Sequence, residues 1–370
     1  MKKSVNFSME NMLDIYTDYL ISSTGQTSAT GLSRLLDEAI SHDSITRFLN
    51  TKDFNSKSLW QSVKPLVRAH QNAEAYLVFD DCLIEKQHTD ENALISWHWD
   101  HAKGRSVKGI NLLTAFYVTQ KEGDSEALCI PVLFELILKT VLFSVIKTKK
   151  LMRQSPVTKN ELMQSMINQC IHNQLIFKYI LADSWYASTD NMHFIAAKKK
   201  YFIFDLKDNR LASLSEQKPL KKASWTNIKS LEMPDNTPLK VWLKDMDFPV
   251  LLTKQVFKNE DEQTSGVRFL VTNEFSLTNE QFLNHYKKRW KVEEYHKSLK
   301  QNASIAKSPT RTLITQSNHL YCAIAAFVKL EKLKWATKLN HAQIKAKIYI
   351  KALKAAYQEL TFLKQQVMPA

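Results

Sequence analysis

The sequence predicts an α/β fold that is flanked by helical regions at both ends. Three observations predict it. Residues 1–70 carry the apolar spacing of helices, residues 75–182 alternate short apolar runs with one helical stretch, and residues 200–275 hold strand-like runs between turn-rich loops. Helical spacing returns after residue 278 and continues toward the C-terminal end.

The composition is that of a folded protein of two to three domains. The chain has 370 residues, of which 44% are hydrophobic and 24% are charged. Its six glycines form no phosphate-binding loop and no dinucleotide fingerprint, so no nucleotide cofactor is expected. Four well-separated cysteines indicate reduced cytoplasmic thiols. The longest apolar run is interrupted by Glu135 and Lys139, which argues against a membrane span.

The positive charge is concentrated near one end of the chain. Residues 284–370 contain 17 Lys and Arg against 4 Asp and Glu, so this segment carries +13 of the total +14. Aromatic and apolar residues alternate with these lysines, which favours a folded basic region over a solvated tail. A one-sided positive field of this kind is typical of a protein that binds a polyanion such as DNA.

The first element pair lies in the N-terminal region. Apolar spacing predicts short helices over 32–39 and 45–49, and the junction 41–43 is turn-like. Two short helices with a tight junction are compatible with a DNA-binding helix-turn-helix or with one corner of an ordinary helical bundle.

Strand predictions dominate the next segment. A continuous apolar run at 75–79 ends in Asp80 and Asp81, and a second run at 177–182 ends in Asp183. Between them, two runs with short polar connections predict antiparallel neighbours, and a helix is expected over Lys159–Cys170. The antiparallel pair comprises 110–118 and 128–134.

A β-rich segment then precedes the C-terminal helices. We interpret residues 200–274 as an all-β insertion, with predicted strands at 201–204, 239–243, 249–253 and 267–272. A long helix is expected from Thr278 to about Gln301, followed by two more helices. The last helix shows a 4-3-4-3 apolar spacing at Tyr349, Leu353, Ala356, Leu360 and Leu363.

The helix expected at 278–301 carries a third acidic residue. At 100° per residue, Tyr286, Arg289, Glu293 and Lys300 share one narrow face, and an opposite apolar face is formed by Val292, Tyr295 and Leu299. By itself this pattern also fits a solvated helix with an ordinary Arg289–Glu293 pair.

Together with two aspartates at strand ends, Glu293 could complete a metal site. Three carboxylates of this kind can hold two divalent cations roughly 3.5–4 Å apart, the arrangement used in phosphodiester cleavage. Oxygen ligands suit Mg²⁺ or Mn²⁺. Tyr, Arg and Lys beside the acid are suited to phosphate contacts.

A family resemblance follows from these residues. Within HYKKRWKVEEYHKSLK, the pattern Tyr286-x2-Arg289-x3-Glu293-x6-Lys300 resembles the YREK signature of DDE transposases from bacterial cut-and-paste insertion sequences. The segments YLVFDDC and YILADSW resemble the surroundings of the first two acids of the same triad. The resemblance spans residues 75–305 and implies an RNase H-like, retroviral-integrase-like core with a β-rich insertion before the catalytic helix.

The resemblance also implies an activity. It implies metal-dependent DNA cleavage that frees a 3′-OH at each element end, followed by strand transfer of that 3′-OH into target DNA. The implied catalytic and metal-binding residues are Asp80, Asp183 and Glu293, holding two Mg²⁺ or Mn²⁺ ions. The implied DNA-binding residues are Tyr286, Arg289 and Lys300.

The implied partners are double-stranded DNA, as terminal inverted repeats and target, and a second subunit in a synaptic homodimer. Neither a membrane nor a nucleotide is implied, and the location is the bacterial cytoplasm at the nucleoid. The implied organisation is a helical DNA-binding region at 1–70, a core at 71–199 and 275–310 split by the insertion 200–274, and a basic helical region at 311–370.

Three alternatives stay open from the sequence. Relatives usually have Thr or Ser two residues after the first acid, where this chain has Cys82, and Asp81 could replace Asp80 as that acid. Trp225 and Trp242 could stack a displaced base or belong to the core. The chain could also be an RNase H-like nuclease without strand transfer, or a non-catalytic DNA-binding protein derived from a transposase.

Overall fold

The chain folds into two compact units. The computed structural model describes residues 9–51, 53–100, 103–121, 123–124, 126–144, 146, 149, 151–219, 225–258 and 265–367. The first unit comprises the described residues within Met1–Leu59, Leu83–Asn111 and Glu294–Ala370, and the second comprises those within Trp60–Cys82 and Leu112–Glu293. No described helix is long and apolar enough to cross a membrane.

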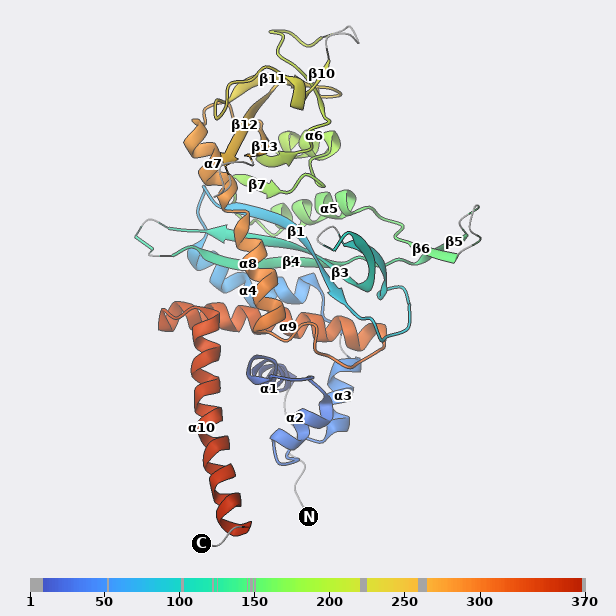
Figure 1. Ribbon diagram of the computed structural model, residues 1–370, viewed down its shortest axis with the longest axis vertical. Coiled ribbons are helices and arrows are strands. Elements are labelled where there is room, and N and C mark those ends of the chain that lie inside the picture. Colours follow the sequence, from blue (N-terminus) through green and yellow to red (C-terminus); the bar gives the residue numbers. More distant parts are fainter. Residues whose placement is uncertain are drawn as a thin grey trace. The chain divides into compact units, whose positions relative to one another are not determined.

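The first unit is mainly helical (Figure 1). Its helices are α1 (Met9–Ser22), α2 (Ala29–Leu35), α3 (His42–Thr51), the end of α8 (Trp290–Gln301), α9 (Leu313–Thr337) and α10 (His341–Val367). The strand β2 (Ser96–Asp100) pairs antiparallel with the start of β3 (Arg105–Thr119). The two short helices expected near the N-terminus are therefore present as α2 and α3. Helix α2 ends earlier than its apolar spacing suggested, because Asp37 and Glu38 adopt left-handed φ angles of 48° and 60°.

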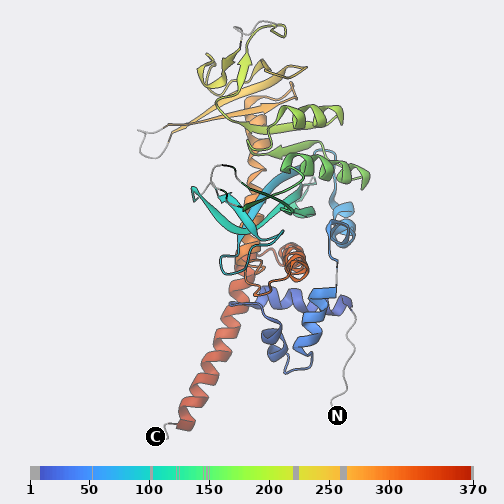
Figure 2. The same ribbon diagram turned by 90° about the vertical axis from the view of Figure 1, so that its right-hand side faces the viewer.

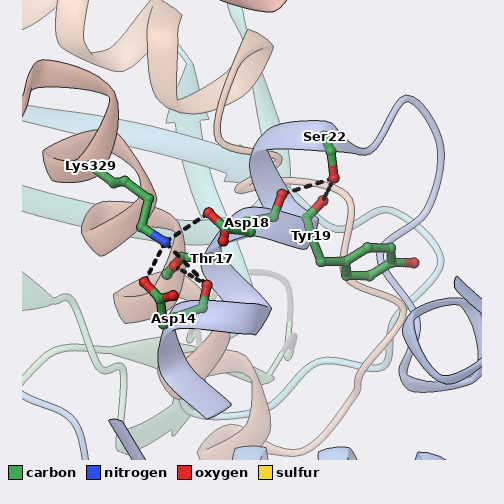
Figure 3. A network of polar contacts seen from close by, with 6 residues as sticks. All are labelled: Asp14, Thr17, Asp18, Tyr19, Ser22 and Lys329. Carbon is green, nitrogen blue, oxygen red and sulfur yellow. Dashed lines mark hydrogen bonds and ion pairs between the residues drawn. The ribbon is translucent and has the colours of Figure 1, made fainter. Parts of the chain in front are cut away.

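Helix α9 forms the centre of the first unit, and α1 and α3 pack against it. Tyr16 on α1 is fully buried and its hydroxyl lies 3.1 Å from Nδ1 of His319 on α9. At the edge of the same helix pair, Lys329 Nζ donates to Asp14 Oδ1 at 2.6 Å and to Asp18 Oδ1 at 2.7 Å (Figure 3). A buried polar contact and an exposed ion-pair group therefore both fix α1 on α9.

The second unit is built on one large mixed sheet. The strand order of this sheet is β10-β9-β11-β12-β13-β8-β7-β1-β3-β2, with β4 also paired to β3. The strands are β1 (Tyr76–Glu85), β3, β4 (Leu128–Leu136), β7 (Tyr179–Ala182), β8 (Tyr201–Leu206), β9 (Leu211–Ser213), β10 (Thr226–Asn227), β11 (Leu239–Leu243), β12 (Val250–Lys258) and β13 (Ser265–Thr272). A short 3-10 turn, η2 (Ile228–Ser230), follows β10.

Three neighbouring strands at the middle of this sheet are parallel. Strand β7 pairs in parallel with both β1 and β8, and β3 and β4 form an antiparallel pair beyond β1. Parallel strands need helical crossovers, which α5 (Lys159–His172) and α6 (Thr189–Ala197) supply. These two helices lie side by side (Figures 1 and 2). The arrangement is consistent with the RNase H-like nuclease fold that the resemblance implies.

Residues 200–274 continue this sheet. The strands predicted there are present as β8 and β11–β13, and β8 pairs with β7 on one side and β13 on the other. The segment therefore adds further strands to the central sheet. The hydrogen bonds that join these strands are not specified by an apolar pattern alone.

Two element predictions were wrong in detail. Strand β1 does not end at Asp80 but runs to Glu85, because Cys82 and Ile84 continue the alternation of buried side chains. The helix expected over 278–301 is divided into α7 (Asn279–Lys287) and α8, because the backbone N–H groups of Lys288 and Arg289 bond three residues back, to His285 and Tyr286.

The remaining elements of the second unit are α4 (Ser56–His70), which begins in the first unit, and a separate two-stranded hairpin. The hairpin consists of β5 (Val141–Ser144) and β6 (Leu151–Gln154), and its strands pair only with each other in the described structure (Figure 1).

The buried histidine of α9 gives the first prediction. Nε2 of His319 faces the carbonyl oxygens of Ser304 and Ile305, so it carries the proton and Nδ1 accepts from Tyr16. Burial is the main cause that lowers the pKa of His319, to about 4, and Lys86 adds to it. This folded pKa lies below the ordinary value of 6.5. The free energy of unfolding that the neutral His319 side chain contributes is therefore present in full above pH 6.5 and is lost as the pH falls toward 4.

We expect His319→Gln to remove this pH dependence. At pH 5 the loss from His319 amounts to about 2 kcal/mol in the free energy of unfolding. Urea unfolding of wild type and variant at pH 7.5 and pH 5 isolates this contribution, because other groups titrate equally in both proteins. If wild type and His319→Gln lost the same free energy of unfolding between pH 7.5 and pH 5, the loss could not be assigned to His319.

Candidate active site

Three aspartates lie in one row across the parallel strands of the second unit. Asp183 directly follows β7, and the registers of β7 with β1 and with β8 place Asp80 on one side of it and Asp205 on the other. Residues in register on neighbouring parallel strands face the same way. The order of the sheet therefore brings together carboxylates that are far apart in the sequence.

These carboxylates repel one another in a partly desolvated site. Burial, followed by the charges of Asp183 and Asp81, raises the pKa of Asp80 to about 7. Burial also raises the pKa values of Asp183 and Asp205. Two backbone N–H groups oppose the effect: that of Asp81 donates to Asp80 at 2.9 Å, and that of Trp185 to Asp183 at 2.9 Å. The row is thus a concentration of negative charge that the fold compensates only in part.

Asp81 is held by a different set of contacts. Lys159, the first residue of α5, donates to Asp81 Oδ2 at 2.7 Å, and the buried hydroxyl of Tyr186 donates to Asp81 Oδ1 at 2.7 Å. Asp81 is adjacent to Asp80 on a strand, so the two side chains leave opposite faces of the sheet. Its carboxylate therefore ties β1 to α5 and to the segment after β7.

Arg289 connects the row to Glu293. It lies in the tight turn between α7 and α8, where its Nη2 donates to Glu293 Oε1 at 2.5 Å and its Nη1 lies 4.0 Å from Asp80 Oδ2. The Nε of Arg289 is buried and makes no hydrogen bond within the described structure. A buried guanidinium with one unsatisfied N–H is suited to a further anionic acceptor.

Tyr286 does not lie on the polar helix face that the sequence predicts for it with Arg289, Glu293 and Lys300. Tyr286 is buried, and its ring is 5.7 Å from the guanidinium of Arg289 and 5.6 Å from that of Arg268 on β13. Burial raises its pKa. The break at 288–289 changes the angular relation that an unbroken helix would give Tyr286 and Glu293. The apolar face formed by Val292, Tyr295 and Leu299 is buried as predicted.

Lys300, Trp225 and Trp242 were also singled out from the sequence. Lys300 is exposed near the end of α8 and belongs to the first unit. Trp225 and Trp242 are both half-buried, Trp242 on β11.

An exposed indole adjoins the aspartate row. Trp185 has an exposed fraction of 47%, and the ammonium groups of Lys159 and Lys207 lie 5.3 and 5.5 Å from its ring centre. Its backbone is fixed by the bond to Asp183, and the next residue, Tyr186, is buried against Asp81. A flat aromatic surface between two cations is thus held next to the acids.

The carboxylates of Asp80, Asp183 and Glu293 fit the ligand preference of a hard divalent cation only in part. Asp80 and Asp183 offer clustered carboxylate oxygens, and their raised pKa values show that the negative charge there is under-compensated. Among the described residues no three His, Cys, Asp or Glu side chains are grouped as a ready set of metal ligands. Of the three predicted ligands, Asp80 and Asp183 interact electrostatically with each other. The third, Glu293, forms an ion pair with Arg289.

Sequence reasoning missed Asp205, Lys159 and Trp185. Asp205 follows the apolar run 201–204 in the same way that Asp183 follows 177–182, which is a signal that the sequence contains. The pairing of Lys159 with Asp81 joins residues 78 positions apart, and only the packing of α5 reveals it.

Two models of known families match the chain. A family model described as DDE superfamily endonuclease matches residues 5–227, which is more than half of the chain. The chain belongs to the DDE superfamily of endonucleases. A second model, described as a transposase DDE domain, matches residues 151–328. No curated protein matches the sequence.

The two matched ranges together include all of the predicted acids. The endonuclease model covers Asp80 and Asp183, and the transposase model covers Asp183 and Glu293. DDE superfamily nucleases generally use divalent metal ions, and transposases bind DNA. The chain therefore belongs to a superfamily of endonucleases and is similar to transposase DDE domains, and its aspartate row lies inside the matched regions.

The unequal environments of Asp80 and Asp81 give the second prediction. Because the folded pKa of Asp80 lies near 7 and its ordinary value is 3.8, the folded state loses stability as the pH rises from about 4 to about 7. We expect Asp80→Asn to stabilise the metal-free protein at pH 8, by at most about 4 kcal/mol, and to give no such gain at pH 4. Thermal unfolding in EDTA at both pH values measures this.

Asp81→Asn is the matched control. It removes the carboxylate that pairs with Lys159 and Tyr186, so we expect it to destabilise the protein at pH 8. If Asp81→Asn stabilised the protein and Asp80→Asn destabilised it, Asp81 rather than Asp80 would be the acid whose charge destabilises the folded state.

Proposed function

We propose that this DDE endonuclease is a transposase that cleaves DNA at the ends of an insertion sequence and joins the freed 3′-OH to target DNA. The observation that carries the proposal is the row of Asp80 and Asp183 with Arg289 bridging to Glu293. This arrangement supplies acids for metal ions and a guanidinium for a phosphate within one cluster of the second unit.

Asp80, Asp183 and Glu293 are proposed as the residues that hold two Mg²⁺ or Mn²⁺ ions. Such ions, when bound, activate the attacking oxygen and stabilise the leaving oxygen of the phosphodiester. Asp80 is preferred over Asp81 because Asp81 is engaged by Lys159 and Tyr186, whereas Asp80 is electrostatically coupled to Asp183. Glu293 contributes its carboxylate when Arg289 exchanges it for a phosphate.

Arg289 is proposed to bind the phosphate at the cleaved end. Its unsatisfied Nε and its planar guanidinium match the bidentate geometry of a phosphate. Tyr286 holds the guanidinium from one side, which is a positioning role because its ring is buried. Lys300 is proposed to contact DNA from the exposed part of α8.

Trp185 is proposed to stack on an unpaired base beside the cleaved phosphate. Stacking of this type is sequence-tolerant, and Lys207 beside the ring would supply a phosphate contact that accompanies it. The backbone bond between Trp185 and Asp183 fixes the distance between the stacked base and the acids.

The finer features of the transposase assignment belong to the same proposal. They are membership of the YREK subgroup, a bacterial source, residues 200–274 as the insertion of that subgroup, and a homodimer that pairs two DNA ends. The helical region 1–70 would bind terminal repeats, and the basic region 311–370, with most of the net positive charge, would bind DNA more generally.

Glu293→Gln separates chemistry from binding. We expect this variant to bind DNA about as well as wild type but to nick it at least about a hundredfold more slowly, since one metal-ligand charge is lost. The substrate is a supercoiled plasmid carrying the DNA that flanks the protein's own gene, incubated with Mg²⁺ or Mn²⁺. Glu294→Gln, at the exposed neighbouring position, is the control and should nick normally.

Nicking by Glu293→Gln at the wild-type rate would contradict the assignment of Glu293. Cleavage by wild type without joining of the 3′-OH to a second plasmid would identify a nuclease that lacks strand transfer. Absence of cleavage by wild type would indicate a DNA-binding protein.

Trp185→Ala tests the stacking surface. Loss of one base–indole stack, about 1–3 kcal/mol, should weaken binding to a DNA end with a single-stranded overhang by about tenfold. Trp185→Phe keeps a flat ring and should restore most of the affinity. Fluorescence anisotropy with labelled DNA measures both, and unchanged affinity in Trp185→Ala would contradict a stacking role.

A further inference from the structure

The three strands beside the aspartate row also carry a row of tyrosines. Tyr76, Tyr179 and Tyr201 are the first residues of β1, β7 and β8, and the strand registers place them side by side. Each lies four residues before one of the aspartates, in the segments YLVFD, YILAD and YFIFD. Since side chains four residues apart on a strand share a face, the two rows lie on one face of the sheet, about 13 Å apart.

Helix α7 is attached to the tyrosine row through His285. The Tyr76 hydroxyl lies 2.5 Å from Nδ1 of His285, and the centre of the imidazole ring lies 4.6 Å from that of Tyr179. The rings of Tyr76 and Tyr179 are themselves stacked, with their centres 5.3 Å apart. A hydrogen bond and a ring contact, from two different strands, therefore hold the half-buried imidazole in one orientation.

The direction of this hydrogen bond follows from the two pKa values. Burial raises the pKa of Tyr76 to about 12, and burial is the main cause that lowers the pKa of His285 below its ordinary value. At neutral pH the hydroxyl therefore donates and the uncharged imidazole accepts. Four charged groups also act on the imidazole, two acids that raise its pKa and two lysines that lower it: Glu274, Glu74, Lys178 and Lys288.

The backbone connects His285 directly to the turn that carries Arg289. The N–H of Lys288 donates to the carbonyl of His285 at 3.1 Å, and the N–H of Arg289 donates to the carbonyl of Tyr286 at 2.9 Å. These two bonds close the turn between α7 and α8. A shift of the His285 backbone would therefore move the turn and the arginine with it.

Strand β1 and the α7–α8 segment are thus joined at two places. One is the hydrogen bond between Tyr76 and His285. The other lies four residues further along both segments, where Nη1 of Arg289 is 4.0 Å from Asp80 Oδ2 and the same guanidinium pairs with Glu293. The first connection is made by uncharged groups and the second by charged ones.

We propose that His285 is a positioning residue that fixes Arg289 and Glu293 over the aspartate row. Tyr76 is its partner, on the strand that carries Asp80. The inference rests on the proposed function, because it gives the fixed turn a task in DNA cleavage. His285 itself contacts neither DNA nor metal, and its effect passes through the backbone of the turn.

The proposed chemistry breaks the charged connection and leaves the uncharged one. In that chemistry Arg289 exchanges Glu293 for a phosphate, and Asp80 binds metal. The hydrogen bond between Tyr76 and His285 involves none of these groups. It therefore keeps the turn in place at the stage when the ion pairs of Arg289 no longer do so.

Hydrogen exchange tests the positioning on the full-length protein without DNA or metal. The amide N–H groups to follow are those of Lys288 and Arg289, whose bonds close the turn. Tyr76→Phe removes the donor hydroxyl and keeps the ring, so we expect both amides to exchange about fivefold faster, which corresponds to one hydrogen bond. Tyr201→Phe is the matched control. It removes a hydroxyl from the same row but not the partner of His285, and exchange at the turn should not change.

Two substitutions of His285 separate its hydrogen bond from its bulk. His285→Asn places an amide oxygen near the position of Nδ1 and can still accept from Tyr76, whereas His285→Leu fills the space without an acceptor. With Mg²⁺ and saturating plasmid DNA, we expect His285→Leu and Tyr76→Phe each to nick about fivefold more slowly than wild type. His285→Asn should recover most of the rate. The double variant Tyr76→Phe/His285→Leu should be no slower than either single variant, because both remove the same bond.

Four results would overturn the proposal. They are unchanged exchange of the turn amides in Tyr76→Phe, equally faster exchange in Tyr201→Phe, nicking by His285→Leu at the wild-type rate, and equal slowing by His285→Asn and His285→Leu. A failure of the proposed function is distinct from these, because the wild-type protein itself would then not cleave DNA. The exchange measurement would still decide whether His285 fixes the turn.

Discussion

The row of carboxylates on three adjacent parallel strands is the constraint on which the site depends. Burial and mutual repulsion of Asp80, Asp183 and Asp205 destabilise the folded state at neutral pH. The surrounding contacts reduce this cost: Lys159 and Tyr186 hold Asp81, and backbone N–H groups donate to Asp80 and Asp183. Arg289 adds a guanidinium that pairs with both Asp80 and Glu293. What the fold leaves uncompensated is the charge that a divalent cation would neutralise.

Much of the fold could be predicted from apolar spacing. The runs at 110–118, 128–134 and 177–182 and the helix beginning at Lys159 are present close to their predicted positions, because burial on a strand or a helix leaves a periodic pattern. The break at 288–289 could not be predicted in this way. It depends on two backbone hydrogen bonds, and no glycine or proline marks it in the sequence.

The candidate site was predictable only in its separate parts. The position of Asp183 at the end of an apolar run was visible, but its proximity to Asp80 and Asp205 follows from strand order and register, which depend on contacts between segments far apart in the chain. The burial of Tyr286 has the same origin, since its ring packs beside Arg268 from a strand. Sequence spacing identified the residue types of the cluster, and tertiary packing determines which of them meet.

The most direct test of this account is the effect of Mg²⁺ on the thermal unfolding of the second unit. A cation that binds the folded row raises the unfolding midpoint in proportion to its affinity. We predict a concentration-dependent rise for the wild type, and none for Asp183→Asn, while the exposed control Asp190→Asn should behave as the wild type. An equal rise in wild type and Asp183→Asn would show that the aspartate row does not bind the metal and would contradict the account.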